Sequence, residues 1–193
     1  MKRRILISVF DKTGIEKFAA LAKQDVEIVS TGGTATRLES EGIKVKSVEK
    51  VTGFPEILGG RVKTLHPMIF GGILGDQHNP EHAKTIAEHG IGFFDAVVVN
   101  LYDFKKFEDI EHIDIGGVAL LRAAAKNGNS CLPVIDPADY DEVVRLLGSG
   151  REIPADIRDA FVAKTFEYTA AYDAAIAVWM RRQIESKQPI WPA

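Results

Sequence analysis

The 193-residue sequence predicts an α/β fold in which helices cover a mostly parallel β-sheet. Short runs of β-branched and other apolar residues alternate along the chain with segments of helical periodicity. Several of the apolar runs have no polar face, which is typical of strands buried on both sides of a parallel sheet. A hydrophobic content of 46% is sufficient for one sizeable core, so we expect residues 1–193 to form a single domain.

The expected strands and helices follow one another in alternation. The strands are expected at residues 4–9 (RILISV), 26–30 (VEIVS), 43–48 (IKVKSV), 95–102 (DAVVVNLY) and 130–135 (SCLPVI). The helices are expected at residues 15–23, 34–41, 81–89, 118–126, 138–147 and 156–183, the last as one long helix or as two in series. A turn at GSGREIP separates a core of about residues 1–150 from a helical segment of about residues 151–193.

One helix start carries a complete local signal. Asp136 is suited to cap the helix that follows, Pro137 fits its first position, and Asp139 offsets the helix dipole. At the C-terminus, the segment SKQPIWPA is expected either to fray or to dock through Trp191.

Composition argues against several classes of partner. The formal charge is -3 and the sequence has no long basic run, so we expect neither nucleic acid nor an anionic membrane as a partner. No stretch approaches the roughly 20 apolar residues of a membrane helix, and the apolar run in MKRRILISVF is too short for a signal peptide. The single Cys131 cannot form an internal disulfide, which fits a reducing compartment, and we expect a cytoplasmic protein.

Polar loops follow the first two expected strands, where ligands bind in open parallel sheets. The loop SVFDKTG offers Ser8, Lys12 and Thr13. In STGGTA, Gly32 and Gly33 allow close backbone approach before a helix, so free N–H groups and the positive end of the dipole converge. Each loop fits a phosphate cradle, and each fits equally an ordinary tight turn with an N-cap.

The segment GGRVKTLHP concentrates three polar groups within six residues. In an extended conformation Arg61 and Lys63 would lie on the same side, where they suit a phosphate or a polarised carbonyl. A solvated basic turn is the alternative, and His66 fits a local cap before Pro67. The five histidines and one cysteine lack the spacing of metal ligands, so we expect no metal.

Two further segments carry candidate polar side chains. In NLYDF, Asn100 and Tyr102 can reach the crevice, although a tyrosine at this position also fits simple packing. In DIGGVALLRAAAKN, Asp114 precedes a small-residue helix that ends at Lys126. Asp114 also fits a helix N-cap, and Lys126 fits a cation at a helix C-terminus.

Taken in order, SVFDKTG, STGGTA, TGFPEILGGRVKTLHP, NLYDF, DIGGVALLRAAAKN and TAAYD resemble the N-terminal inosine monophosphate (IMP) cyclohydrolase domain of the bifunctional purine-biosynthesis enzymes. The resemblance runs from residue 5 to about residue 183. It implies a methylglyoxal-synthase-like three-layer α/β sandwich, a homodimer, and catalysis without a cofactor. The implied reaction closes the ring of 5-formamidoimidazole-4-carboxamide ribonucleotide with loss of water to give IMP, in the last step of purine biosynthesis. The formyltransferase domain is missing here, so we expect a stand-alone enzyme supplied by a separate formyltransferase or a piece of the bifunctional one.

The resemblance also implies the roles of individual residues. Its catalytic group corresponds to Lys63, Tyr102, Asp114 and Lys126. Its substrate-binding residues correspond to Phe10, Asp11, Lys12, Thr31, Gly32, Gly33, Thr34, Arg61, Lys63, Thr64, Val99, Asn100, Asp114, Ile115 and Gly116. Phe10 stands where many members have a serine, so one hydroxyl contact to the substrate is lost.

The implied chemistry fits these residue types. We expect Asp114 to accept the amide proton, Tyr102 and Lys126 to handle the formyl oxygen, and Lys63 to add positive charge. One continuous helix from Gly116 to Lys126 would be about 15 Å long, too far for Asp114 and Lys126 to meet one small group. Either the glycines delay the helix, the helix is distorted, or the length of the substrate or a second subunit bridges the gap.

Two competing functions use the same phosphate loops. Methylglyoxal synthase shares the implied fold, but it would not need RVKTLHP or LLRAAAKN. A non-catalytic nucleotide-binding regulatory domain would need the loops without Tyr102, Asp114 and Lys126. The presence of all three favours the enzyme.

Overall fold

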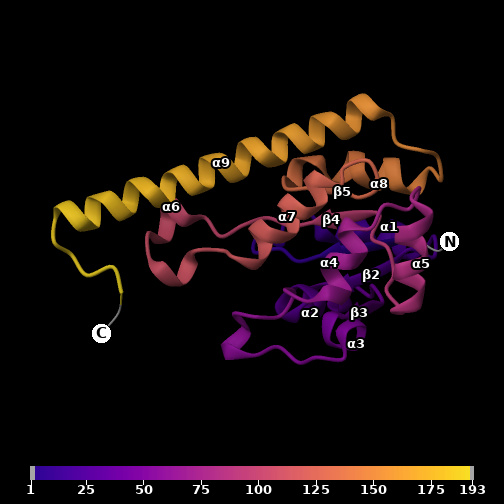
Figure 1. Cartoon of the computed structure of the whole chain (residues 1–193), viewed down its shortest axis with the longest axis horizontal. Helices are drawn as coiled ribbons and strands as arrows, with labels where there is room; N and C mark the ends of the chain where they lie inside the picture. Colours follow the sequence, from indigo (N-terminus) through magenta and orange to yellow (C-terminus); the bar gives the residue numbers. More distant parts are fainter. Residues whose placement is uncertain (1–2, 192–193) are drawn as a thin grey trace.

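The computed structural model describes residues 3–191 and contains one five-stranded sheet (Figure 1). Its strands are β1 (Arg4–Ile7), β2 (Glu27–Ser30), β3 (Val45–Ser47), β4 (Ala96–Val98) and β5 (Leu132–Val134). All pairings are parallel, in the order β3-β2-β1-β4-β5. Each expected strand is confirmed, in shortened form, because the flanking residues already belong to the loops.

Helices cover both faces of the sheet. They are α1 (Ala19–Ala22), α2 (Gly32–Ser40), α3 (Val48–Thr52), α4 (Pro67–Leu74), α5 (Pro80–Glu88), α6 (Phe104–Phe107), α7 (Gly116–Lys126), α8 (Tyr140–Gly148) and α9 (Ala155–Glu185). Short 3₁₀ turns are η1 (Ile15–Phe18), η2 (Leu58–Gly60), η3 (Ile110–His112) and η4 (Pro137–Asp139). On one face η1, α1, α2 and α8 bury their apolar side chains, and on the other α4 and α7 do so.

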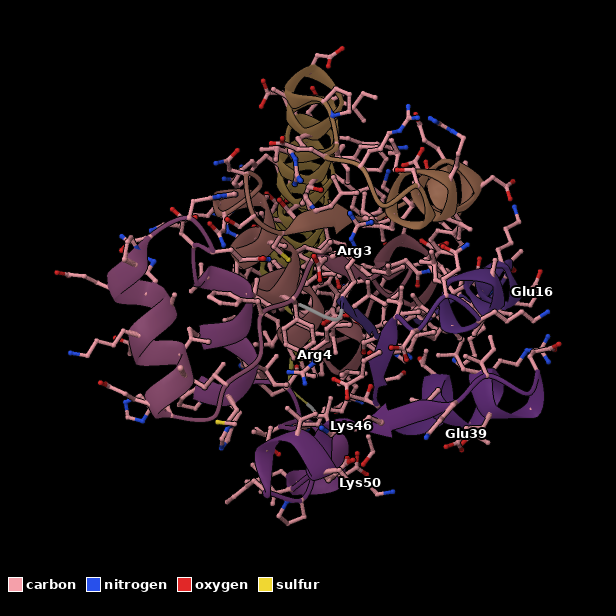
Figure 2. All side chains as sticks on the ribbon, turned by 90° about the vertical axis from the view of Figure 1, so that its right-hand side faces the viewer. Arg3, Arg4, Glu16, Glu39, Lys46 and Lys50 are labelled. Carbon is pink, nitrogen blue, oxygen red and sulfur yellow. The ribbon has the colours of Figure 1, made fainter. Side chains whose placement is uncertain are left out.

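The alternation of side chains along each strand creates these two cores. Ile5 and Ile7 of β1 pack with η1, α1 and α8, whereas Leu6 between them packs with α4 and α7. Figure 2 looks onto the amino ends of the strands, with helices to either side of the sheet. The expected three-layer α/β sandwich is therefore confirmed.

The helix signals of the sequence were sound but incomplete. Asp136 accepts a hydrogen bond from Ala138 N–H at 2.9 Å, as its capping pattern predicted, and α9 is one unbroken helix. Helices α3, α4 and α6 were not predicted from the sequence. Helix α4 has the sequence PMIFGGIL, whose apolar residues surround the axis, so it shows no polar face by which periodicity could reveal it.

The long helix α9 covers the edge of the sheet at β5 and contributes to both cores (Figure 1). Phe161 near its start packs with the α8 layer, and Tyr172 and Trp179 pack with the α7 layer. The ring of Phe104 in α6 lies 5.5 Å from that of Trp179. By contrast, Trp191 is 67% exposed, so the tail does not dock through its ring.

Strand order defines where a ligand site belongs. The chain leaves β1 toward β2 and β3 and then returns to the other side of β1 with β4, so the connection reverses direction between β1 and β4. Open α/β sheets bind ligands at such a reversal, beyond the carboxyl ends of the strands. In Figure 1 the N-terminus is at the right, and the loop after α3 and the α6 segment extend to the left, where the carboxyl ends lie.

Candidate functional site

Asn100 joins the loop after β4, in which it lies, to the loop after β1, called the first loop below. Its buried side chain accepts hydrogen bonds through Oδ1 from the N–H groups of Phe10 at 2.8 Å and Asp11 at 2.9 Å. Its Nδ2 donates to the carbonyl of Asp11 at 2.8 Å. The side chain thus holds the loop after β1 in place, and its predicted contact with the substrate stays a prediction.

The first loop meets the second at the amino end of α2. Ser8 Oγ lies 3.1 Å from Thr31 Oγ1, and Thr34 Oγ1 donates to the carbonyl of Val9 at 3.0 Å. A methyl group on Gly33 would lie 3.8 Å from Cε of Lys12, so the lysine side chain passes over the start of the helix. A helix amino terminus beside an ammonium group favours an anion, so this arrangement is compatible with the predicted phosphate cradle, which stays a prediction.

The basic segment forms a small hairpin instead of an extended strand. Ile57 and Val62 pair across Gly59 and Gly60, whose φ angles of 65° and 87° are left-handed. Arg61 has helical angles of -64° and -28°, so the expected extended pairing of Arg61 and Lys63 on one side is wrong. The Arg61 guanidinium instead pairs with the carboxylate of Glu111.

The residues after Arg61 approach the start of α7. Thr64 is buried, and its Oγ1 would lie 3.2 Å from a methyl group on Gly116. Lys63 is close enough for its charge to lower the pKa of Asp114. His66 accepts a hydrogen bond from Met68 N–H through Nδ1 at 3.1 Å and caps α4, so its local role is confirmed.

Asp114 is fixed at both its backbone and its side chain. Oδ1 accepts a hydrogen bond from Gly117 N–H at 2.7 Å, in the capping geometry that the sequence allowed. A methyl group on Gly117 would lie 2.7 Å from Asp114 Oδ2, so glycine leaves the space that this carboxylate needs. Burial raises the pKa of Asp114, while the Gly117 N–H and Lys63 oppose the rise.

Tyr102 belongs to a closed cycle of four rings. Its ring centroid lies 4.7 Å from Phe10 and 5.6 Å from His112. Phe107 stacks on His112 at 4.0 Å and lies 6.0 Å from Phe10. Phe10 therefore ties the first loop, through its aromatic contacts, to the segment that leads to Asp114.

Lys126 lies apart from the other candidates. Helix α7 begins at Gly116 and runs unbroken to Lys126, so the glycines do not delay it and its length is about 15 Å. Lys126 is exposed and has no hydrogen-bond or ion-pair partner in the part of the chain that the structure describes. Of the remaining binding candidates, Val99 is buried behind the loops and Ile115 is 62% exposed.

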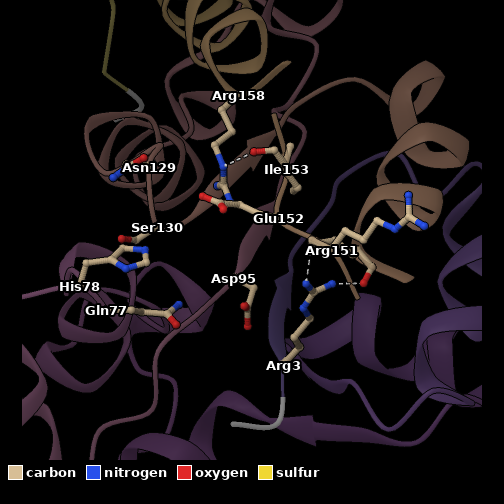
Figure 3. A pocket seen from close by; sticks show the side chains of 11 residues that line it. Arg3, Gln77, His78, Asp95, Asn129, Ser130, Arg151, Glu152, Ile153 and Arg158 are labelled. Carbon is tan, nitrogen blue, oxygen red and sulfur yellow. Dashed lines mark hydrogen bonds between the residues drawn. The ribbon is translucent and has the colours of Figure 1, made fainter. Parts of the chain in front are cut away.

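Two cavities lie at the opposite end of the sheet. One has a volume of about 170 Å³ and is lined by residues that include Arg3, Asp95, Ser130 and Arg158 (Figure 3). The other, of about 240 Å³, lies beside Arg3 and Gln24. None of the predicted site residues lines either of these two cavities.

Residues 3–191 contain neither a metal-binding cluster nor a membrane-spanning helix. No group of three or more histidine, cysteine, aspartate or glutamate side chains is arranged to hold a metal ion. No helix in the same range is both long enough and apolar enough to cross a membrane.

Three residues of the site were not predicted from the sequence. Glu111 neutralises Arg61, His112 contacts Tyr102, and the hydroxyl of Tyr172 contacts the backbone of Asp114. Only TAAYD, which contains Tyr172, was noticed as a motif, and it carried no assigned role.

Comparison with known proteins identifies the family to which this parallel-sheet fold belongs. A family model described as "MGS-like domain" matches residues 14–129, and one described as "AICARFT/IMPCHase bienzyme" matches residues 124–191. A solved structure, "Crystal structure of ForH", is 35% identical with a TM-score of 0.82, over 92% of this chain and 96% of that one. The chain belongs to the MGS-like domain family.

Curated relatives narrow the assignment. The "Bifunctional purine biosynthesis protein PurH" of Brucella ovis is 48% identical over 201 residues, which cover 99% of this chain and 37% of that protein. The protein of the same name from Brucella anthropi is 49% identical over 199 residues, with 98% and 37% covered. The chain thus spans 37% of the length of these relatives, and over that span it is similar to proteins named for purine biosynthesis.

Proposed function

We propose that the chain is an IMP cyclohydrolase, which closes the ring of 5-formamidoimidazole-4-carboxamide ribonucleotide with loss of water. One observation carries the proposal. The Lys12 side chain beside the amino end of α2 lies at the same edge of the sheet as the carboxylate of Asp114, with Lys63 near that carboxylate. The similarity to proteins named for purine biosynthesis supports the same conclusion.

In this proposal the phosphate of the nucleotide binds at the amino end of α2. The N–H groups of Gly32 and Gly33 and the ammonium group of Lys12 supply the positive charge. The first loop keeps its shape because Asn100 holds it, so the cation is already positioned before the substrate arrives. Arg61, which pairs with Glu111, contributes to affinity only if the substrate displaces that carboxylate.

The ring closure needs a proton acceptor and charge stabilisation. The carboxamide nitrogen attacks the formyl carbon of the same molecule, and Asp114 accepts the proton that the nitrogen loses. Tyr102 and Lys63 stabilise the formyl oxygen. That oxygen leaves as water, which takes one proton back from Asp114 and the other from the formamido N–H as the ring C=N bond forms. Neither a metal nor a cofactor has a role in these steps.

Lys126 acts, in this proposal, from a second copy of the chain. The length of α7 separates Lys126 from Asp114 of the same chain by about 15 Å or more, and the lysine is exposed. A homodimer in which α7 of one copy reaches the loops of the other would complete the site. We further propose a cytoplasmic location, consistent with the buried free thiol of Cys131, and formylation of the substrate by a separate active site.

The test measures the formation of IMP directly. The purified chain is mixed with the formylated ribonucleotide, and the ultraviolet absorbance of IMP is followed. Wild-type turnover that falls at least about 100-fold in Asp114→Asn supports the proposal. Turnover of dihydroxyacetone phosphate would indicate methylglyoxal synthase instead, and binding of IMP without any turnover would indicate a regulatory domain.

A further inference from the structure

The hydroxyl of Tyr172 bridges two backbone groups next to the proposed catalytic residues. It accepts a hydrogen bond from the N–H of Asp114 at 2.9 Å and donates one to the carbonyl of His112 at 3.1 Å. Tyr172 is 7% exposed, and it reaches the site from α9, far along the chain. Both bonds are lost if the hydroxyl is removed, and neither backbone group has another partner in the described part of the chain.

This bridge completes the fixation of the Asp114 side chain. The N–H of Asp114 is held by Tyr172, and Oδ1 is held by Gly117 N–H at 2.7 Å. Within the described residues Oδ2 accepts no hydrogen bond, so it is the oxygen left to take a proton. An aspartate held at its backbone N–H and at one carboxylate oxygen cannot move away from a bound ring without breaking one of these bonds.

The same bridge reaches Tyr102. The carbonyl that Tyr172 holds belongs to His112, whose ring lies edge-on to Tyr102 at 5.6 Å. The Asp109 carboxylate holds the other side of that ring, at 2.7 and 2.8 Å from Nδ1. One hydroxyl of α9 therefore holds the backbone of both Asp114 and His112, and the ring of His112 contacts Tyr102.

We infer that Tyr172 is a positioning residue for Asp114, and that α9 is part of the catalytic apparatus as well as the cover of β5. Helix α9 lies outside the residues matched by the MGS-like model and within those matched by the AICARFT/IMPCHase model. The tyrosine is thus supplied by the part of the chain that the MGS-like core does not include. This inference rests on the proposed function.

The test compares Tyr172→Phe with Tyr168→Phe. Phenylalanine retains the ring that packs 6.3 Å from Phe104, so only the hydroxyl is removed. Tyr168 is on the same helix and is 44% exposed, and its hydroxyl makes no hydrogen bond in the described part of the chain. It is therefore a matched control. We expect kcat to fall about tenfold in Tyr172→Phe while KM changes less than about threefold, and we expect no change in Tyr168→Phe.

A double-mutant cycle separates positioning from simple destabilisation. If Tyr172 acts through Asp114, then Tyr172→Phe adds less than about twofold to the loss in kcat already caused by Asp114→Asn. Independent effects that multiply would overturn the inference, as would a Tyr172→Phe variant that melts at a lower temperature but retains wild-type kcat per folded molecule. If the wild-type chain itself does not form IMP, the proposed function fails, and the inference fails with it.

The pH profile gives a second readout. The charged and titratable groups facing Asp114 are Lys63 and the Tyr172 hydroxyl, with Asp173 next to Tyr172 on α9. Loss of the bridge frees the backbone of Asp114, and we expect the carboxylate to become more hydrated, which would lower its pKa toward the ordinary value. We expect the acidic limb of kcat to move to lower pH in Tyr172→Phe and to stay in place in Tyr168→Phe; an unmoved limb in Tyr172→Phe would contradict the role.

Discussion

Replacement of Asn100 by alanine tests the geometry of the loops most directly. The substitution removes three hydrogen bonds, at 2.8, 2.9 and 2.8 Å, between a buried side chain and the loop after β1. At about 1 kcal/mol net for each bond, the free energy of unfolding should fall by about 3 kcal/mol. For a chain of this size that corresponds to a melting temperature lower by about 6 to 12 °C.

The same substitution should weaken nucleotide binding. The loop that Asn100 holds carries Lys12, so in Asn100→Ala the loop must become ordered as the ligand binds. We expect the Kd for IMP, measured by calorimetry, to rise about tenfold or more. Asn129→Ala is the control, because Asn129 is exposed and makes no hydrogen bond within residues 3–191. A melting temperature of Asn100→Ala within 2 °C of wild type, or an unchanged Kd, would refute the reasoning.

Three further predictions follow from the same geometry. Lys12→Ala should raise the Kd for IMP about 10- to 100-fold, as expected for loss of a charge-assisted phosphate contact. The control Lys23→Ala, at an exposed lysine, should leave the Kd unchanged. Equal changes in Kd for the two variants would exclude a specific anion site at Lys12. Because the Asp114 carboxylate must be ionised to accept a proton, the acidic limb of the kcat–pH profile should have a pKa above the ordinary 3.8. Lys63→Ala should move this limb to still higher pH, because the charge of Lys63 lowers the pKa of Asp114. A limb at or below 3.8 would contradict the assignment of Asp114 as the proton acceptor. Lys126→Ala should lower kcat about 100- to 1,000-fold with little change in affinity. Mixed and refolded with Asp114→Asn, it should recover roughly a quarter of wild-type activity if the two residues act across a dimer, and no recovery would show that they act within one chain.

Local sequence signals predicted most of the secondary structure. The five strands were evident because buried parallel strands are runs of apolar, often β-branched residues, and this property needs no knowledge of the partner strand. The caps at Asp136 and His66 were readable for the same reason, since a cap bonds to residues within its own turn. Helix α4 was missed because its apolar sequence has no periodic pattern.

Some contacts of the candidate site were predictable from the sequence and others were not. The loops at Lys12 and Gly33 were predictable as neighbours, because the carboxyl ends of adjacent parallel strands meet at one edge of the sheet. The pairing of Arg61 with Glu111 was not predictable, since the two residues are 50 positions apart and the hairpin that orients Arg61 depends on two left-handed glycines. The functional roles of the matched residues stay predictions until the variants are measured.

By itself the sequence determined the order of strands and helices, the polar loops after the strands, and the capping of individual helices, because each depends on residues within one turn or one strand. The tertiary structure alone decided that Asn100 is engaged by the first loop, that Arg61 is neutralised, and that Tyr172 of α9 holds the backbone of Asp114. The physical reason is that a hydrogen bond or an ion pair acts over about 3 Å of space, whatever the separation along the chain. Folding brings distant residues within that range, and local pattern does not record which ones will meet.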